Sequence, residues 1–118
     1  MHPVAIKRIY DPASPSDGRR ILVDRLWPRG VKKSAAHLDG WMKDLAPSDG
    51  LRRWFGHEPA RWPEFRRRYE GELGAHADGV KALRRMAESS PVTLLYGARD
   101  RDRNEARVLA DLVEARET

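Results

Sequence analysis

Three segments of the chain have the hydrophobic pattern of β-strands. Residues 4–10, VAIKRIY, alternate between apolar and polar positions, and residues 20–27 open on a run of three aliphatic side chains. Residues 92–96, VTLLY, carry no charge and are bounded by a proline and a glycine. An uncharged run of this length is typical of a strand that is buried on both faces, as in a parallel sheet. We therefore expect 20–26 and 92–96 to be adjacent parallel strands, joined through helices.

Apolar residues at helical spacing fill much of the chain between and after these strands. In the clearest case, residues 59–73, they recur at intervals of three and four: Trp62, Phe65, Tyr69 and Leu73. Further helices or helical turns are expected at 34–37, 39–47, 51–57, 77–89 and 103–116. The order of elements predicts a single α/β domain over residues 1–118, with a mostly parallel sheet flanked by helices. Because only three strands are clear, the sheet is small or includes an edge strand that the pattern does not reveal.

Residues 20–30, RILVDRLWPRG, place two opposite charges inside the second expected strand. Strict alternation puts Arg25 and Trp27 on one face of this strand and Asp24 on the other. Because the two charges point to opposite sides, each of them needs its own partner if it is buried. Near the carboxyl end of a strand, however, a charge can reach the crevice in which open α/β sheets bind ligands.

The resulting hypothesis is an anion-binding site built on Arg25 and Arg29. Guanidinium groups suit planar, bidentate contact with phosphate or carboxylate. Asp24 would hold one arginine in place, and Trp27 would be a supporting residue, although a Trp27 that stacks on the Arg25 guanidinium could also be purely structural. The alternative is purely structural, with Asp24 paired to an arginine and Arg25 paired to an acidic residue of a helix.

A second part of this site is expected in residues 96–104, YGARDRDRN, between the last strand and the last helix. The N-terminus of a helix attracts anions through its free N–H groups, and Arg99, Arg101 and Arg103 add positive charge. Tyr96 would orient a ligand or donate a proton to it. Asp102 and Glu105 form a D-x-x-E pattern that resembles a helix capping box. The alternative here is a solvated turn with a tyrosine in the core.

The charge distribution favours an anionic partner. The chain has 23 basic and 18 acidic side chains, and residues 19–33 alone carry six basic and one acidic, which equals the whole net charge of +5. A phosphate-bearing small molecule, such as a nucleotide or phosphorylated metabolite, is the leading expectation. The rivals are a nucleic-acid-binding accessory protein that uses the basic runs 19–33 and 61–68, and a ligand-free protein-interaction module. An Arg25 inside a pocket would favour the small molecule, and an exposed stripe of arginines would favour nucleic acid.

Several other chemistries lack the residues that they need. The chain has no cysteine, which excludes disulfides and cysteine nucleophiles and fits a cytoplasmic protein. Its four histidines are scattered, so no metal site is expected. There is no glycine-rich phosphate loop or nucleophile elbow, no cofactor is expected, and no apolar run is long enough to span a membrane. Catalysis would need an acid or base from Tyr96, Asp24 or His57, so the catalytic residues, like the oligomeric state, stay open.

Three long stretches resemble one known family. They read KRIYDPASPSDGRRILVDRLWPRGVKK, LDGWMKDLAPSDGLRRWFGHEPARWPEFRRRYEGEL and VTLLYGARDRDRNEARVLADLV, and they are similar to the YeaO-like bacterial proteins of the domain-of-unknown-function family 488. The resemblance implies a small cytoplasmic α/β domain of Rossmann-like character and no established activity. Other branches of the wider family look as though they carry a cysteine, with a nearby glutamate, at the position of Tyr96. Their chemistry would not transfer to this chain, whereas Arg25 and Arg29 are retained.

Overall fold

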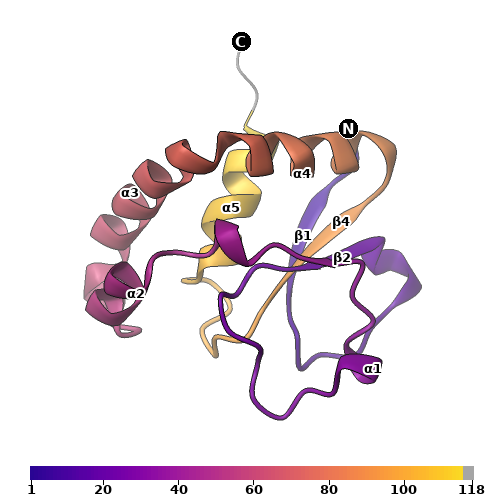
Figure 1. Cartoon of the computed structure of the whole chain (residues 1–118), viewed down its shortest axis with the longest axis horizontal. Helices are drawn as coiled ribbons and strands as arrows, with labels where there is room; N and C mark the ends of the chain where they lie inside the picture. The colour runs from indigo at the N-terminus through magenta and orange to yellow at the C-terminus, as the bar shows by residue number, and fades with distance from the viewer. Residues whose placement is uncertain (116–118) are drawn as a thin grey trace.

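The computed structural model describes residues 1–115, which fold around a sheet of four strands (Figure 1). The strands are β1 (Val4–Arg8), β2 (Arg19–Leu22), β3 (Gly40–Trp41) and β4 (Val92–Tyr96). Their order across the sheet is β1-β4-β2-β3, and every neighbouring pair is parallel. The predicted pairing of the second and last clear strands is confirmed, because Ile21 of β2 lies opposite Leu94 of β4. All five residues of β4 are buried, as expected for a central strand.

The edge strand that the pattern did not reveal is β3, which is two residues long. We expected a helical turn over 39–47, but the first part of this segment continues along β2, where Met42 N donates to Leu22 O at 2.9 Å. Only residues 43–45 form a 3-10 turn. Two residues are too few to show an alternating pattern, so hydrophobicity alone gives no strand signal here.

Five α-helices of the described chain follow the predicted segments. They are α1 (Lys33–Ala36), α2 (Asp49–Phe55), α3 (Trp62–Leu73), α4 (Ala77–Ser89) and α5 (Glu105–Glu114). The predicted cap of the last helix is wrong: Asn104, rather than Asp102, caps α5, and its Oδ1 accepts from Arg107 N at 3.0 Å. Residue 116, the predicted end of this helix, lies outside the described residues.

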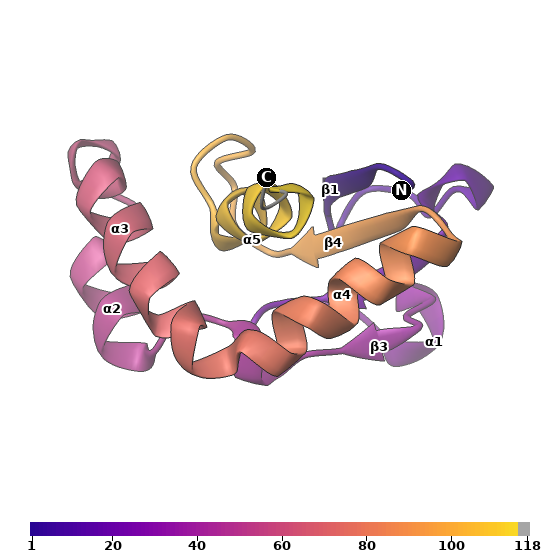
Figure 2. The ribbon, with the colours of Figure 1, turned by 90° about the horizontal axis from the view of Figure 1, so that it is seen from above.

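The two faces of the sheet are covered differently. The face that carries Ile21 and Leu94 packs against α4 and α5, and its core continues into the aromatic residues of α2 and α3. The opposite face carries Leu22 and Leu95 and is covered by α1 and the loops around it. Figure 2 shows α2 packed along α3, with both helices beyond the arrowhead of β4. These two helices therefore form a wall past the carboxyl ends of the strands.

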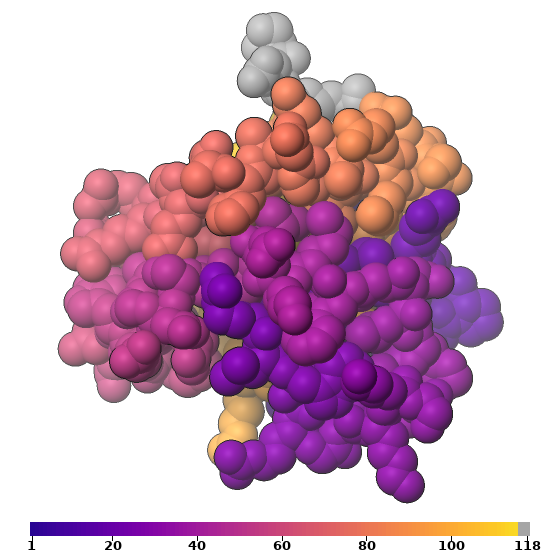
Figure 3. All heavy atoms as spheres, in the orientation of Figure 1, coloured from indigo at the N-terminus to yellow at the C-terminus, as the bar shows by residue number. Residues whose placement is uncertain are grey.

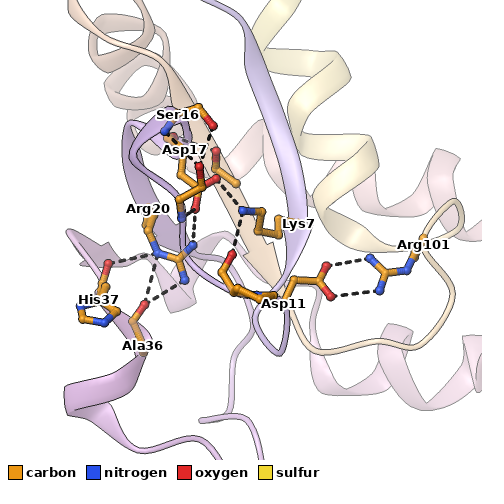
Figure 4. Close-up of polar contacts among 11 residues, drawn as sticks. Lys7, Asp11, Ser16, Asp17, Arg20, Ala36, His37 and Arg101 are labelled. Atoms are coloured by element: carbon orange, nitrogen blue, oxygen red, sulfur yellow. Dashed lines mark hydrogen bonds and ion pairs between the residues drawn. The ribbon is translucent and has the colours of Figure 1, made fainter.

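A buried ion cluster around Asp17 ties the start of β2 to the rest of the sheet (Figure 4). Asp17 Oδ1 accepts from Lys7 Nζ at 2.7 Å, and its Oδ2 accepts from Arg20 Nη1 at 2.6 Å. Ser14 N donates to the same Oδ2 at 3.0 Å, and Thr93 of β4 donates to the Asp17 carbonyl at 2.8 Å. Burial acts to raise the pKa of Asp17, but the hydrogen bonds to its carboxylate outweigh burial and hold the pKa below 3.8.

Arg20 belongs to the basic run 19–33 but faces the interior. Its side chain is only 6% exposed, and its guanidinium donates to the carbonyl oxygens of Ala36 and His37 as well as to Asp17. Arg20 thereby connects β2 to α1 and is not available to an outside partner.

Candidate functional site: a cleft at the carboxyl ends of the strands

A cleft of about 480 Å³ opens beyond the carboxyl ends of β2 and β4. It is lined by residues 24–29 after β2, by residues 97–98 and 103–105 after β4, and by side chains from α2 and α3. In Figure 3 the purple atoms that follow β2 and the magenta atoms of α2 flank a hollow, in which yellow-orange atoms that follow β4 are visible. Open parallel sheets bind ligands at this place, and the volume is in the range of small-molecule sites.

Asp24 and Glu105 form a pair of carboxyl groups in the inner part of the cleft. Asp24 Oδ2 accepts from Gly97 N, at the end of β4, at 2.9 Å. Glu105 is the first residue of α5, and its side chain hydrogen-bonds to Asp24. Burial, this hydrogen bond and the charge of Asp24 raise the pKa of Glu105 well above its ordinary range. This environment favours the protonated form of Glu105 next to the Asp24 carboxylate.

Backbone contacts fix the Asp24 side of this pair. Trp41 Nε1 donates to Asp24 O at 2.7 Å. A Cβ atom at Gly97 would lie 3.0 Å from Asp24 Oδ2, so glycine lets the backbone N–H approach the carboxylate without displacing it. The prediction that Asp24 holds an arginine in place is wrong, because Asp24 forms no ion pair with an arginine within residues 1–115. Its partners are the backbone of Gly97 and the carboxyl group of Glu105.

Four arginines line the cleft with long contacts to the protein: Arg25, Arg29, Arg52 and Arg103. The Arg25 guanidinium lies 3.4 Å from the carbonyl oxygens of Ala46 and Pro47. Arg25 and Arg52 approach the same carboxylate, that of Asp49, at 3.9 and 3.4 Å. Asp49 is itself half-exposed, so neither arginine is held by a buried partner.

The other two cleft arginines are exposed. Arg103 Nη1 lies 3.2 Å from Asp100, and the Arg29 side chain makes no hydrogen bond or ion pair to any residue that the structure describes. The arginines of α3 differ, since Arg67 and Arg68 both bind Glu64, at 2.6 and 2.7 Å. A guanidinium has five N–H donors, and the cleft arginines leave most of theirs free of close protein partners.

Aromatic side chains form the wall of the cleft next to α2. Phe55 and Phe65 stack with ring centroids 4.4 Å apart, and the His57 ring lies 6.1 Å from that of Phe55. Tyr69 packs behind Phe65 at 5.8 Å and donates its hydroxyl proton to Leu45 O. Burial, together with three nearby acidic residues, raises the pKa of Tyr69 well above 10, so its hydroxyl stays neutral.

Trp27 supports the segment after β2 rather than Arg25. Its ring packs edge-on against Trp41 with centroids 5.4 Å apart, and its Nε1 donates to Val31 O at 2.7 Å. It clusters with Leu22, on the face opposite to the predicted one. The prediction fails because β2 ends at Leu22, and strict alternation does not continue through the turn that follows.

The structure gathers four of the six predicted site residues at the cleft: Asp24, Arg25, Trp27 and Arg29. The remaining two, Tyr96 and Arg99, lie outside the lining that the described residues form. Tyr96 is the last residue of β4, and alternation turns its side chain into the main core, where it is 1% exposed. Arg99 is exposed in the loop that follows.

Of the residues that line the cleft, the sequence did not assign Glu105 or Arg52 to the site. Glu105 was interpreted as part of a capping box, although its position at the first turn after β4 places it at the same sheet edge as Asp24. Arg52 carried no comparable signal, since nothing local indicates that α2 folds back over the strand ends. Within residues 1–115, no three histidine or acidic side chains are grouped as ligands for a metal ion.

The fold and the site together define the class of this protein. It is a small α/β protein with a parallel sheet and a ligand-sized cleft at the carboxyl ends of the strands. Residues 3–118 match the family model described as "Inactive DUF488-N3 subclade", and the chain belongs to this family. The YeaO-like resemblance is thereby confirmed. None of the helices in the described residues is long and apolar enough to cross a membrane.

The relatives of the chain are similar over nearly their whole length. It is 49% identical over 108 residues to "Uncharacterized protein YeaO" of Escherichia coli, and this alignment covers 92% of this chain and 94% of that protein. It is 42% identical over 113 residues to "Uncharacterized protein Rv3073c" of Mycobacterium tuberculosis and to "Uncharacterized protein Mb3100c" of Mycobacterium bovis, over 96% of this chain and 95% of each relative. No solved structure matches the chain at a significant level.

Proposed function

We propose that this protein binds a small anionic molecule, one that carries a phosphate group, in the cleft beyond β2 and β4. The observation that carries the proposal is the state of the cleft arginines. Arg25 and Arg52 reach no protein acceptor closer than 3.4 Å, whereas Arg66 and Arg67 of α3 bind carboxylates at 2.9 and 2.6 Å. Positive charge gathered in a concave site without close partners favours an anion from solution.

Binding is a better proposal than catalysis. The description of the family uses the word inactive, and the chain contains no cysteine. The acid and base candidates from the sequence are also dispersed, since Tyr96 is buried in the core and only Asp24 and His57 line the cleft. The cytoplasmic location stays a prediction.

The ion pairs of the second basic run, residues 61–68, argue against the alternative of a nucleic-acid interface. Arg66 binds Asp111 at 2.9 Å, and Arg67 and Arg68 share Glu64. These acidic partners reduce the positive charge on the outer face of α3, which would have formed the stripe of positive charge. Arg25, which separates the two hypotheses, lines the cleft, and this favours a small molecule.

Thermal unfolding in phosphate tests the proposal. For a dissociation constant of about 1 mM, 10 mM phosphate stabilises the folded protein by roughly 1.4 kcal/mol, or about 5–6 °C in Tm. We expect this increase in wild type and its loss in Arg25→Met and Arg52→Met. Both variants should fold, because their shared partner Asp49 is half-exposed. Removing either arginine therefore leaves no buried carboxylate without a partner.

Arg67→Met is the matched control, since it removes one exposed arginine and leaves the cleft intact. Phosphate also stabilises proteins by exclusion from their surface, and this general effect raises Tm equally in all variants. A phosphate shift that is the same in wild type, Arg25→Met and Arg67→Met would contradict the proposal, as would the lack of any shift.

A further inference from the structure

The inner and outer parts of the cleft have opposite chemistry. The partly buried inner part holds the carboxyl pair of Asp24 and Glu105, whereas Arg29, Arg52 and Arg103 on the outer part are exposed. A phosphate monoester is mainly a dianion at neutral pH, so it fits the arginines and is repelled by the charge of Asp24. A simple inorganic anion therefore uses only the outer part of the site.

The inner carboxyl pair calls for a ligand group that donates hydrogen bonds. One oxygen of Asp24 already accepts from Gly97 N at 2.9 Å, and the side chain of Glu105 is engaged with Asp24. The remaining lone pairs of the two groups are acceptors. Amino groups, ring N–H groups and hydroxyl groups satisfy them, and a second anionic group does not.

The cleft lining also includes two aromatic side chains of the core, of which only small parts are exposed. Phe55 and Phe65 stack at 4.4 Å, and both rings belong to the cleft wall. The small exposed part of these rings can contact a planar ring with polar edges, because aromatic pairs favour edge-to-face and offset arrangements. Base rings in nucleic-acid-binding proteins are held by aromatic side chains in this way.

We propose that the ligand is a nucleoside monophosphate, with its phosphate at Arg25 and Arg52 and the hydrogen-bond donors of its base at Asp24 and Glu105. The proposal rests on the proposed function, since the arginines must hold an anion for it to be correct. It adds the chemical class of the ligand and the orientation of the ligand in the cleft. Guanosine monophosphate is the most suitable probe, because its base presents neighbouring N–H donors that match a carboxylate.

Isothermal titration of the wild-type protein with four probes tests this inference without any variant. The probes are guanosine monophosphate, inorganic phosphate, guanosine and ribose 5-phosphate. We expect guanosine monophosphate to bind at least tenfold more tightly than each of the other three, because only it engages both ends of the cleft at once. Equal affinity for ribose 5-phosphate would overturn the assignment of the base.

The variant Asp24→Asn tests the role of the carboxyl pair directly. Its side-chain oxygen can still accept from Gly97 N, while the charge and an acceptor are lost. We expect about a tenfold loss of guanosine monophosphate affinity and no loss of phosphate affinity, whereas Asp44→Asn, an exposed aspartate outside the cleft, changes neither.

The outcomes separate this inference from the proposed function. Phosphate that binds through Arg25, together with no preference for guanosine monophosphate, would refute the inference and leave the anion site intact. If none of the four probes binds, both proposals are wrong. If Asp24→Asn does not fold, the four-probe comparison in wild type still decides.

Discussion

Replacing Asp17 with alanine is expected to lower the free energy of unfolding by roughly 3–5 kcal/mol, the cost of breaking a buried ion pair by removing one partner. The Arg20 side chain is only 6% exposed and would keep its charge without a carboxylate. Lys7 would lose its partner at 2.7 Å as well, and the N–H of Ser14 would lose an acceptor. For a chain of this size the change corresponds to a decrease in Tm of about 10–20 °C, measurable by urea and thermal unfolding.

Asp11→Ala is the matched control for this variant. Asp11 also binds an arginine, with both oxygens within 3.0 Å of Arg101, but that arginine is 58% exposed. Exposed pairs contribute about 0–1 kcal/mol, so this variant should remain near wild type. Equal stability losses in Asp11→Ala and Asp17→Ala would contradict the structural role given to burial.

The contribution of Asp17 should also depend on pH in a defined direction. The folded-state pKa of Asp17 is lowered, so its stabilising effect is present above the unfolded-state pKa of about 3.9 and is lost as pH falls through the folded-state pKa. The stability difference between wild type and Asp17→Ala should therefore be constant from pH 7 to about pH 5 and shrink below pH 4. A difference that grows in acid would show that another group carries the effect.

Gly18→Ala is expected to destabilise the fold by roughly 2–6 kcal/mol, as the sum of backbone strain and overpacking. Gly18 has a φ of 63°, a conformation that alanine rarely adopts. A Cβ atom there would lie 2.1 Å from the carbonyl oxygen of Pro91, which is backbone and cannot rotate away. The same carbonyl accepts the hydrogen bond of Arg19 N at 2.9 Å, so relief of the clash would disturb the start of the β2–β4 pairing.

Gly30→Ala separates the two causes. Gly30 has a φ of 79°, and no atom of a described residue lies within 4 Å of its would-be Cβ. This variant should lose only the free energy of the backbone strain, about 1–2 kcal/mol. Chemical denaturation of both variants should therefore show a clearly larger loss for Gly18→Ala, and similar losses at the two positions would contradict the close approach to Pro91.

The parts of the fold that the sequence predicts are those with a long, uniform pattern. The uncharged run 92–96 indicated a central strand, and the spacing from Trp62 to Leu73 indicated α3, because each pattern extends over several residues. β3 escaped prediction because two residues cannot show a period. The end of β2 was placed too late, since Leu26 and Trp27 continue the apolar character of the strand although the backbone has already turned.

The candidate site was predictable where it lies next to a strand and not where it depends on distant packing. Asp24, Arg25 and Arg29 stood out because charges that end an apolar run are costly unless they reach a crevice. The alternation along β4 turns the Tyr96 side chain into the core, and the next residue, Gly97, lines the cleft instead. Arg52 enters the site through the position of α2 against the strand ends, which no local pattern encodes.

We expect an anion to bind in the cleft beyond β2 and β4. A titration of 15N-labelled protein with guanosine monophosphate, followed by two-dimensional 1H–15N NMR, tests this most directly because backbone amides report the position of the ligand. We expect saturable shifts that are largest at the cleft-lining residues Arg25, Gly97, Ala98 and Glu105, and small shifts along the outer face of α3. Largest shifts at residues 66–68, or no saturable shift at millimolar ligand, would contradict it.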